Sequence, residues 1–166
     1  MRAAAAAIPA LLLALGLLAA APSQARDAKL LLKKETGDVK SSCIQLAGGR
    51  QEIICIVVYG KPPYLGFQFG APDSPDSIAV TAGARRKPNS EIEVKVDSYA
   101  SHGIFGDGFV DKEAEAILDE VSDGKTAIVT YQPEDSEKPV SGSIDLADMK
   151  AAIKEVEALQ EMQSRK

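Results

Sequence analysis

Charged and apolar residues alternate without a break from Glu91 to Asp97. Because successive side chains of a β-strand point to opposite faces, this segment predicts a half-buried strand. Its apolar face consists of Ile92, Val94 and Val96. After a glycine-rich loop, Asp111 is placed to cap a helix that Gly124 ends. The apolar positions of that helix recur at helical spacing at Ala114, Ile117, Leu118 and Val121. Another strand is predicted from Lys125 to Tyr131.

Strand-like segments also fill the first half of the chain. Val39 to Leu46 and Gln51 to Tyr59 flank Gly48-Gly49, and glycine permits the tight turn of a β-hairpin. The second strand of this hairpin is apolar from Ile53 to Val58, so we expect a central strand buried on both faces. Further strands are predicted at Tyr64 to Phe69, Ser77 to Ala82 and Val140 to Ile144.

The last predicted element is a helix that starts at Asp145. Its apolar stripe consists of Leu146, Met149, Ile153, Val156 and Leu159. Short strands broken by Gly and Pro turns favour a mainly β protein, an antiparallel β-sandwich with a short helix and a C-terminal helix packed over an edge or an open end. We expect a single domain at 37–166, preceded at 26–36 by an N-terminal segment that is either a flexible arm or an edge strand.

Residues 1–25 are typical of a secretory signal peptide. An almost wholly apolar segment from Ala3 to Ala21 precedes small residues at Ser23 and Ala25, which suit cleavage after Ala25. Alanine is only weakly hydrophobic and Pro9 interrupts the run, so an uncleaved membrane anchor is the less favoured alternative. We therefore expect a periplasmic or secreted protein with no stable membrane span after cleavage.

Both cysteines belong to the predicted mature chain. A three-residue loop in the predicted hairpin would set Cys43 directly opposite Cys55. Cross-strand Cα separations of about 4.5–5.5 Å lie within disulfide range. Since export leads to an oxidising compartment, we expect a disulfide; the alternative is two buried free thiols.

Composition narrows the classes of partner. The formal net charge is −5, and a protein that binds nucleic acid would usually carry a basic excess, so no nucleic acid is expected. Aromatic residues make up only 5% of the chain, so aliphatic side chains must supply most of the core. No cofactor is expected, because no glycine-rich phosphate-binding motif is present.

Candidate chemistry is sparse. The only histidine is His102, and a serine hydrolase would have to combine it with neighbours such as Ser101, Asp97 or Asp107, yet no Gly-x-Ser-x-Gly motif is present. One histidine and two cysteines at bridge spacing cannot complete a zinc tetrahedron. The acidic segment after Gly106 is only loosely similar to a calcium loop. A hydrolase using His102 and a small-ligand or calcium-binding module remain the alternative functions.

Four pieces of the chain resemble the invasion-associated locus B family of exported bacterial proteins. These pieces are Gly37-Asp38-Val39 followed by Cys43, then Cys55, then Pro88 through Asp97, and finally Gly124-Lys125-Thr126 with Ser143 to Ala151. The chain departs from the family at Val39 and Thr36, where Trp and Phe are usual. Ile104 and Phe109 stand where many members have a second cysteine pair.

The resemblance implies an immunoglobulin-like β-sandwich in the cell envelope and no catalytic residues. The family name reflects host-cell entry, but homologues also occur in free-living bacteria, so that role is not carried over. We expect a non-enzymatic exported protein that binds an unidentified envelope or host protein, or another envelope component, through edge strands and the Ile104–Phe109 loop. The candidate binding residues are His102, Ile104, Phe105, Asp107 and Phe109.

Overall fold

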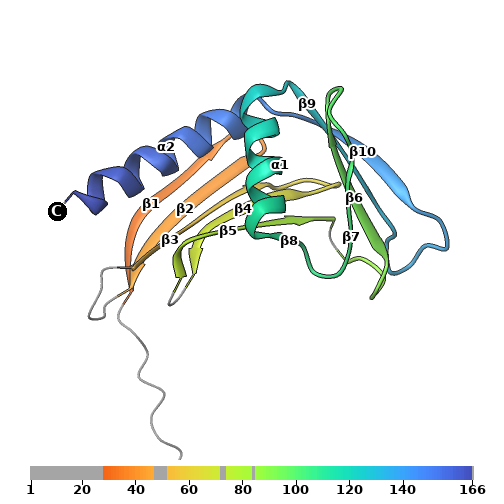
Figure 1. The fold of residues 1–166 in the computed structure, drawn as a ribbon, viewed down its shortest axis with the longest axis horizontal. Coiled ribbons are helices and arrows are strands. Elements are labelled where there is room, and N and C mark those ends of the chain that lie inside the picture. Colours follow the sequence, from red (N-terminus) through yellow and green to blue (C-terminus); the bar gives the residue numbers. More distant parts are fainter. Residues whose placement is uncertain (1–27, 47–51, 72–73, 84, 166) are drawn as a thin grey trace, which may run out of the picture.

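The protein folds into two antiparallel β-sheets and two helices in a sandwich-like arrangement (Figure 1). The computed structural model describes residues 28–46, 52–71, 74–83 and 85–165. The predicted signal peptide and the predicted Gly48-Gly49 turn lie outside these residues. No helix in the described ranges is long and apolar enough to cross a membrane. The mainly β fold with a short helix and a C-terminal helix is therefore confirmed.

The larger sheet has six strands in the order β1-β2-β3-β4-β5-β8. These strands are β1 (Ala28–Thr36), β2 (Val39–Leu46), β3 (Glu52–Tyr59), β4 (Leu65–Ala71), β5 (Ser74–Ala82) and β8 (Phe109–Val110). The smaller sheet has four strands in the order β10-β9-β6-β7. They are β6 (Glu91–Val96), β7 (His102–Phe105), β9 (Thr126–Tyr131) and β10 (Val140–Asp145). Immunoglobulin-like connectivity is not confirmed, because β1 to β5 form a meander rather than a Greek key.

Both helices contact the large sheet, and we call the face that they cover its inner face. Helix α1 (Asp111–Asp123) packs against β5 and β8 and also touches β6 of the small sheet. Helix α2 (Ala147–Ser164) lies along β2 and β3. Figure 1 shows α2 beside the first strands and α1 standing between the two sheets. We expected α2 to cover an edge or an open end of the sandwich, and it packs on the inner face of β2 and β3, next to the edge strand β1.

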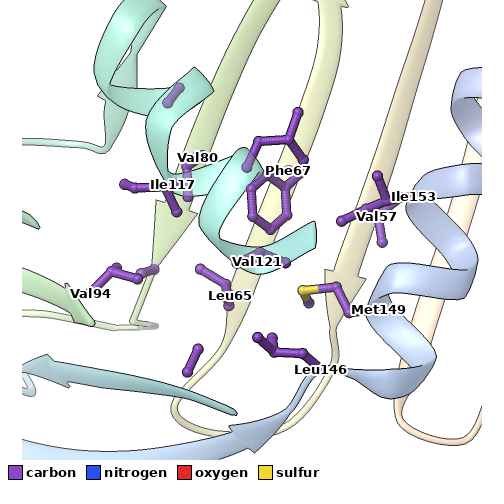
Figure 2. Packing of buried hydrophobic residues seen from close by; sticks show 14 of the residues in the cluster. Val57, Leu65, Phe67, Val80, Val94, Ile117, Val121, Leu146, Met149 and Ile153 are labelled. Atoms are coloured by element: carbon purple, nitrogen blue, oxygen red, sulfur yellow. The ribbon is translucent and has the colours of Figure 1, made fainter. Parts of the chain in front are cut away.

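Aliphatic side chains supply nearly all of the core, as the composition predicted. Figure 2 shows side chains from both sheets and both helices meeting in one cluster. Its labelled members are Val57, Leu65, Phe67, Val80, Val94, Ile117, Val121, Leu146, Met149 and Ile153. The predicted apolar faces of β6, α1 and α2 are all buried or packed against this cluster. The buried side chains therefore form one continuous core that runs from one sheet to the other.

Strand β3 is central in the large sheet, as predicted, but it is buried on one face only. Along β3 the buried residues alternate with half-buried or exposed ones, and Ile56 is 40% exposed. Ile54, Ile56 and Val58 point away from the helices, where no described element covers the sheet. The prediction from the unbroken apolar run, burial on both faces, was therefore wrong for one face of this strand.

Residues 28–36 form the edge strand β1 rather than a flexible arm. This strand pairs with β2 along its length, with a register shift between Leu30 and Leu32. Lys34 Nζ lies 2.8 Å from Glu155 Oε2 of α2, so the strand is also tied to the helix. The charged residues of this segment obscured the strand pattern in the sequence. Lysines and bulges are nevertheless common on edge strands, because they discourage pairing with another chain.

Helix α1 ends where predicted but starts differently. Asp111 is the first helical residue rather than the capping residue, and no side chain caps the amino terminus. Gly124 ends the helix in an extended conformation, with its N–H donating to Glu120 O at 2.7 Å. Glycine is needed there for space, since an added Cβ would collide with Val96 Cγ1 and lie 2.8 Å from Glu120 O.

Replacing Gly124 with valine should lower the free energy of unfolding by about 1–3 kcal/mol, because the new side chain is forced into a filled site. Asp123→Val is the matched control, since Asp123 is the exposed neighbour in the chain, and it should change stability by no more than about 0.5 kcal/mol. Urea denaturation of both variants compares the two positions. Equal stability of Gly124→Val and wild type would show that the helix end can move away.

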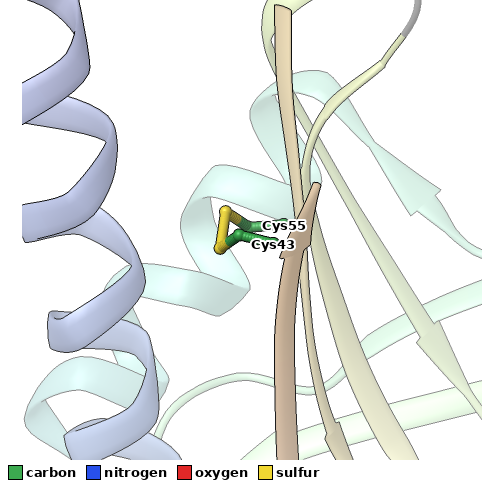
Figure 3. The surroundings of a disulfide bond; sticks show 2 residues. All are labelled: Cys43 and Cys55. Atoms are coloured by element: carbon green, nitrogen blue, oxygen red, sulfur yellow. A yellow bond between two sulfur atoms is a disulfide. The ribbon is translucent and has the colours of Figure 1, made fainter. Parts of the chain in front are cut away.

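The predicted disulfide is present. Cys43 and Cys55 are paired opposite each other in β2 and β3, and their sulfur atoms are bonded. Figure 3 shows the bond on the inner face of these two strands, in the space beside α2. Both cysteines are fully buried, and the described chain contains no free cysteine. The disulfide thus crosslinks neighbouring strands of one sheet under the C-terminal helix.

Candidate functional site

The loop predicted to carry the binding residues contains two short strands, β7 and β8. Pairing with β6 fixes the direction of each β7 side chain: His102 and Ile104 point to the core side, with Val94 and Ile92 as their partners. Phe105 points the other way and is 70% exposed. Phe109 is fully buried against Val80 in the large sheet, so it cannot itself contact a partner.

His102 contacts the short helix rather than an open surface. Its Nε2 lies 3.1 Å from Glu120 Oε1 of α1, and the two side chains are 15% and 16% exposed. The distance is that of an ion pair, although no hydrogen bond with good geometry joins the two groups. This pair links β7 to α1, and His102 therefore has a structural partner.

The structure does not assemble the serine-hydrolase relay considered from the sequence. The carboxylate of Asp97 accepts hydrogen bonds from the backbone amides of Lys125 and Thr126, at 2.8 and 3.0 Å. Asp107 pairs with Arg86, not with His102. Asp97 thus fixes the start of β9 and Asp107 binds Arg86, and neither carboxylate orients the imidazole of His102.

Arg86 fixes the loop that follows Phe105. Its Nη2 donates to the carbonyl of Gly106 and lies 2.8 Å from Asp107 Oδ1. The Arg86 side chain is only 17% exposed, so this contact is sheltered on the arginine side. The guanidinium of Arg86 therefore has its partners within the protein. It holds the base of β7 and sets the position of Phe105.

A cleft of about 480 Å³ opens beside Phe105, on the face of the small sheet that points away from the core. We call this surface the Phe105 face. The floor comes from β6, β7 and β9, and the walls from the turn before β6 and the loop between β9 and β10. Backbone hydrogen bonds join those walls: Lys87 N donates to Gln132 O, and Glu134 N donates to Arg85 O, each at 2.8 Å. Lining side chains include Asn89, Glu91, Glu93, Phe105, Thr130 and Gln132.

The Glu91 carboxylate of the cleft lies over a glycine. Glu91 is opposite Phe105, and Glu93 is opposite Gly103. A Cβ added to Gly103 would lie 2.9 Å from Glu91 Oε1, so the Glu91 carboxylate occupies the space that a side chain would fill. Glu91 therefore leans along the sheet toward the Gly103–Glu93 pair, and both glutamates line the cleft.

Sequence reasoning found Phe105 but missed the rest of this cleft. The alternation in β6 already placed Glu91 and Glu93 on the outward face, which was a usable signal. The alternation does not give the order of the strands in the sheet. Strand β6 lies between β7 and β9, and this order brings Thr130 beside Glu93. Of the five predicted binding residues, the structure places only Phe105 in the cleft, with Asp107 exposed next to it.

Metal binding gains no support from the described side chains. In the part of the chain that the structure describes, no three His, Cys, Asp or Glu side chains are grouped to hold an ion. The acidic residues after Gly106, which loosely resembled a calcium loop, do not converge.

Comparisons with family models, curated proteins and solved structures found no match to this chain.

Proposed function

We propose that this protein is a non-enzymatic, exported protein of the cell envelope that binds a protein or another envelope component through its Phe105 face. The observation that carries the proposal is the exposed aromatic ring of Phe105 at the rim of a polar cleft. Aromatic residues, phenylalanine included, are enriched at the buried centre of protein interfaces relative to the rest of the surface.

Four further features support the proposal. The Cys43–Cys55 disulfide suits an oxidising compartment, and the N-terminal segment resembles a cleavable signal peptide. Membership of the invasion-associated locus B family, proposed on the four sequence pieces, fits the same compartment and a binding role. Phe105 is held by a rigid support, since Arg86 fixes the residues directly after it. A rigid support lowers the entropy lost on binding.

The test compares envelope proteins captured by immobilised wild type with those captured by Phe105→Ala. Loss of the Phe105 side chain should reduce recovery of a specific partner at least about tenfold, as expected for an aromatic residue that dominates an interface. Met162→Ala is the matched control, because Met162 is 60% exposed on α2, away from the cleft. Equal recovery with all three proteins would contradict the proposal.

A further inference from the structure

The cleft on the Phe105 face carries negative charge that the described chain does not neutralise. Glu91 and Glu93 line it, and none of the lining side chains is a lysine or an arginine. Within the described residues, neither glutamate forms an ion pair. The nearest cation along the strand, Lys95, lies opposite Ile128, one row further along the sheet. The site is therefore complementary to a positive charge.

The aromatic ring beside these carboxylates narrows the choice of cation. Phe105 is the cross-strand partner of Glu91, so the ring and the Glu91 side chain start from adjacent points of the sheet. A planar guanidinium group stacks on an aromatic face and donates two parallel hydrogen bonds to a carboxylate at the same time. An ammonium group is a compact point charge and matches this pair of surfaces less well.

The cleft also has the space and hydrogen-bonding groups for a short piece of polypeptide around that side chain. Its volume of about 480 Å³ exceeds that of a single side chain, and it lies on an open sheet face rather than in a closed cavity. Asn89 and Gln132 supply side-chain amides that suit backbone groups. Gln132 Nε2 already donates to Ser136 O at 3.1 Å, which leaves the second N–H and the Oε1 of this amide for a ligand. Their place on the walls leaves the carboxylates on the floor for the guanidinium.

We infer that the cleft binds an arginine side chain of an extended protein segment, with the guanidinium between Phe105 and the carboxylates of Glu91 and Glu93. This inference rests on the proposed function and specifies the chemistry of the partner. Gly103 acts as a positioning residue, because its missing side chain lets the Glu91 carboxylate lie over the sheet. The inference excludes acidic partners and nucleic acid from this face.

The experiment uses the mature protein labelled with ¹⁵N and a synthetic glycine-serine peptide that carries arginines, with a twin that carries lysines. The arginine peptide should shift amide signals of β6, β7 and β9, bind more tightly than the lysine twin, and weaken as salt is added. Glu91→Gln and Glu93→Gln should each raise the Kd roughly tenfold. Glu113→Gln, the same charge change on the exposed face of α1, should leave the Kd unchanged.

Gly103→Ala provides the sharpest variant. The added methyl group displaces only the end of the flexible Glu91 side chain, so stability should be kept while the Kd rises. Equal binding of both peptides, equal effects of Glu113→Gln and Glu91→Gln, or full competition by the small amine spermidine would each overturn the inference. If envelope capture depends on Phe105 but the arginine peptide does not bind, the inference fails and the proposed function stands. If neither result appears, both fail.

Discussion

Phe67→Ala should lower the free energy of unfolding by about 3–5 kcal/mol, the largest loss expected from a single substitution in this protein. Phe67 is fully buried at the centre of the core, and its ring lies 6.4 Å from that of Phe69. Removal of the ring leaves a cavity, because the closely packed elements around it cannot all move in to fill the space. Urea denaturation monitored by circular dichroism measures the loss.

Phe105→Ala is the matched control for this prediction. The same atoms are deleted, but the ring is 70% exposed, so stability should change by no more than about 0.5 kcal/mol. The pair thus separates stability from binding, because Phe67→Ala should unfold more easily and Phe105→Ala should only lose its partner. Similar unfolding midpoints for the two variants would contradict the core described above.

Removal of the disulfide should have the second largest effect. Replacing Cys43 and Cys55 together by alanine should cost about 3 kcal/mol, since the bond closes a loop with a sequence separation of 12 and limits the unfolded chain. Intact mass with and without reductant and alkylation confirms that the bond is present in the wild type. Thermal or urea unfolding then gives the difference in stability.

Reductant is the internal control for the disulfide prediction. It should lower the stability of the wild type toward that of the Cys43→Ala/Cys55→Ala variant, and it should not affect the variant itself. A wild type whose unfolding midpoint ignores reductant under conditions that reduce the bond would show that the hairpin is held by its packing alone.

Segments with a regular apolar period were predicted well, because the positions that the period places on one face are the positions that the fold buries. The apolar positions of β6, α1 and α2 lie in the core or against it, and the hairpin register placed Cys43 opposite Cys55. Propensity and patterning agreed at these places, so tertiary contacts had nothing to override.

The misses came from segments whose structure depends on distant partners. Strand β1 is rich in lysine and forms because β2 offers a full row of backbone partners. Strands β7 and β8 are too short to show a period, and they exist because β6 and β5 lie beside them. The cleft needs three strands and two loops that are far apart in the sequence. No local pattern carries that information.

The position of α2 has a consequence for the order of events during synthesis. This helix follows all the strands of the described chain, yet it covers β2 and β3, which are synthesised well before it. The inner face of this hairpin, Val57 included, therefore stays exposed to water until residues 147–164 pack on it. Chains truncated before Ala147 would leave that face exposed to water, so holdase chaperones and proteases should recognise them.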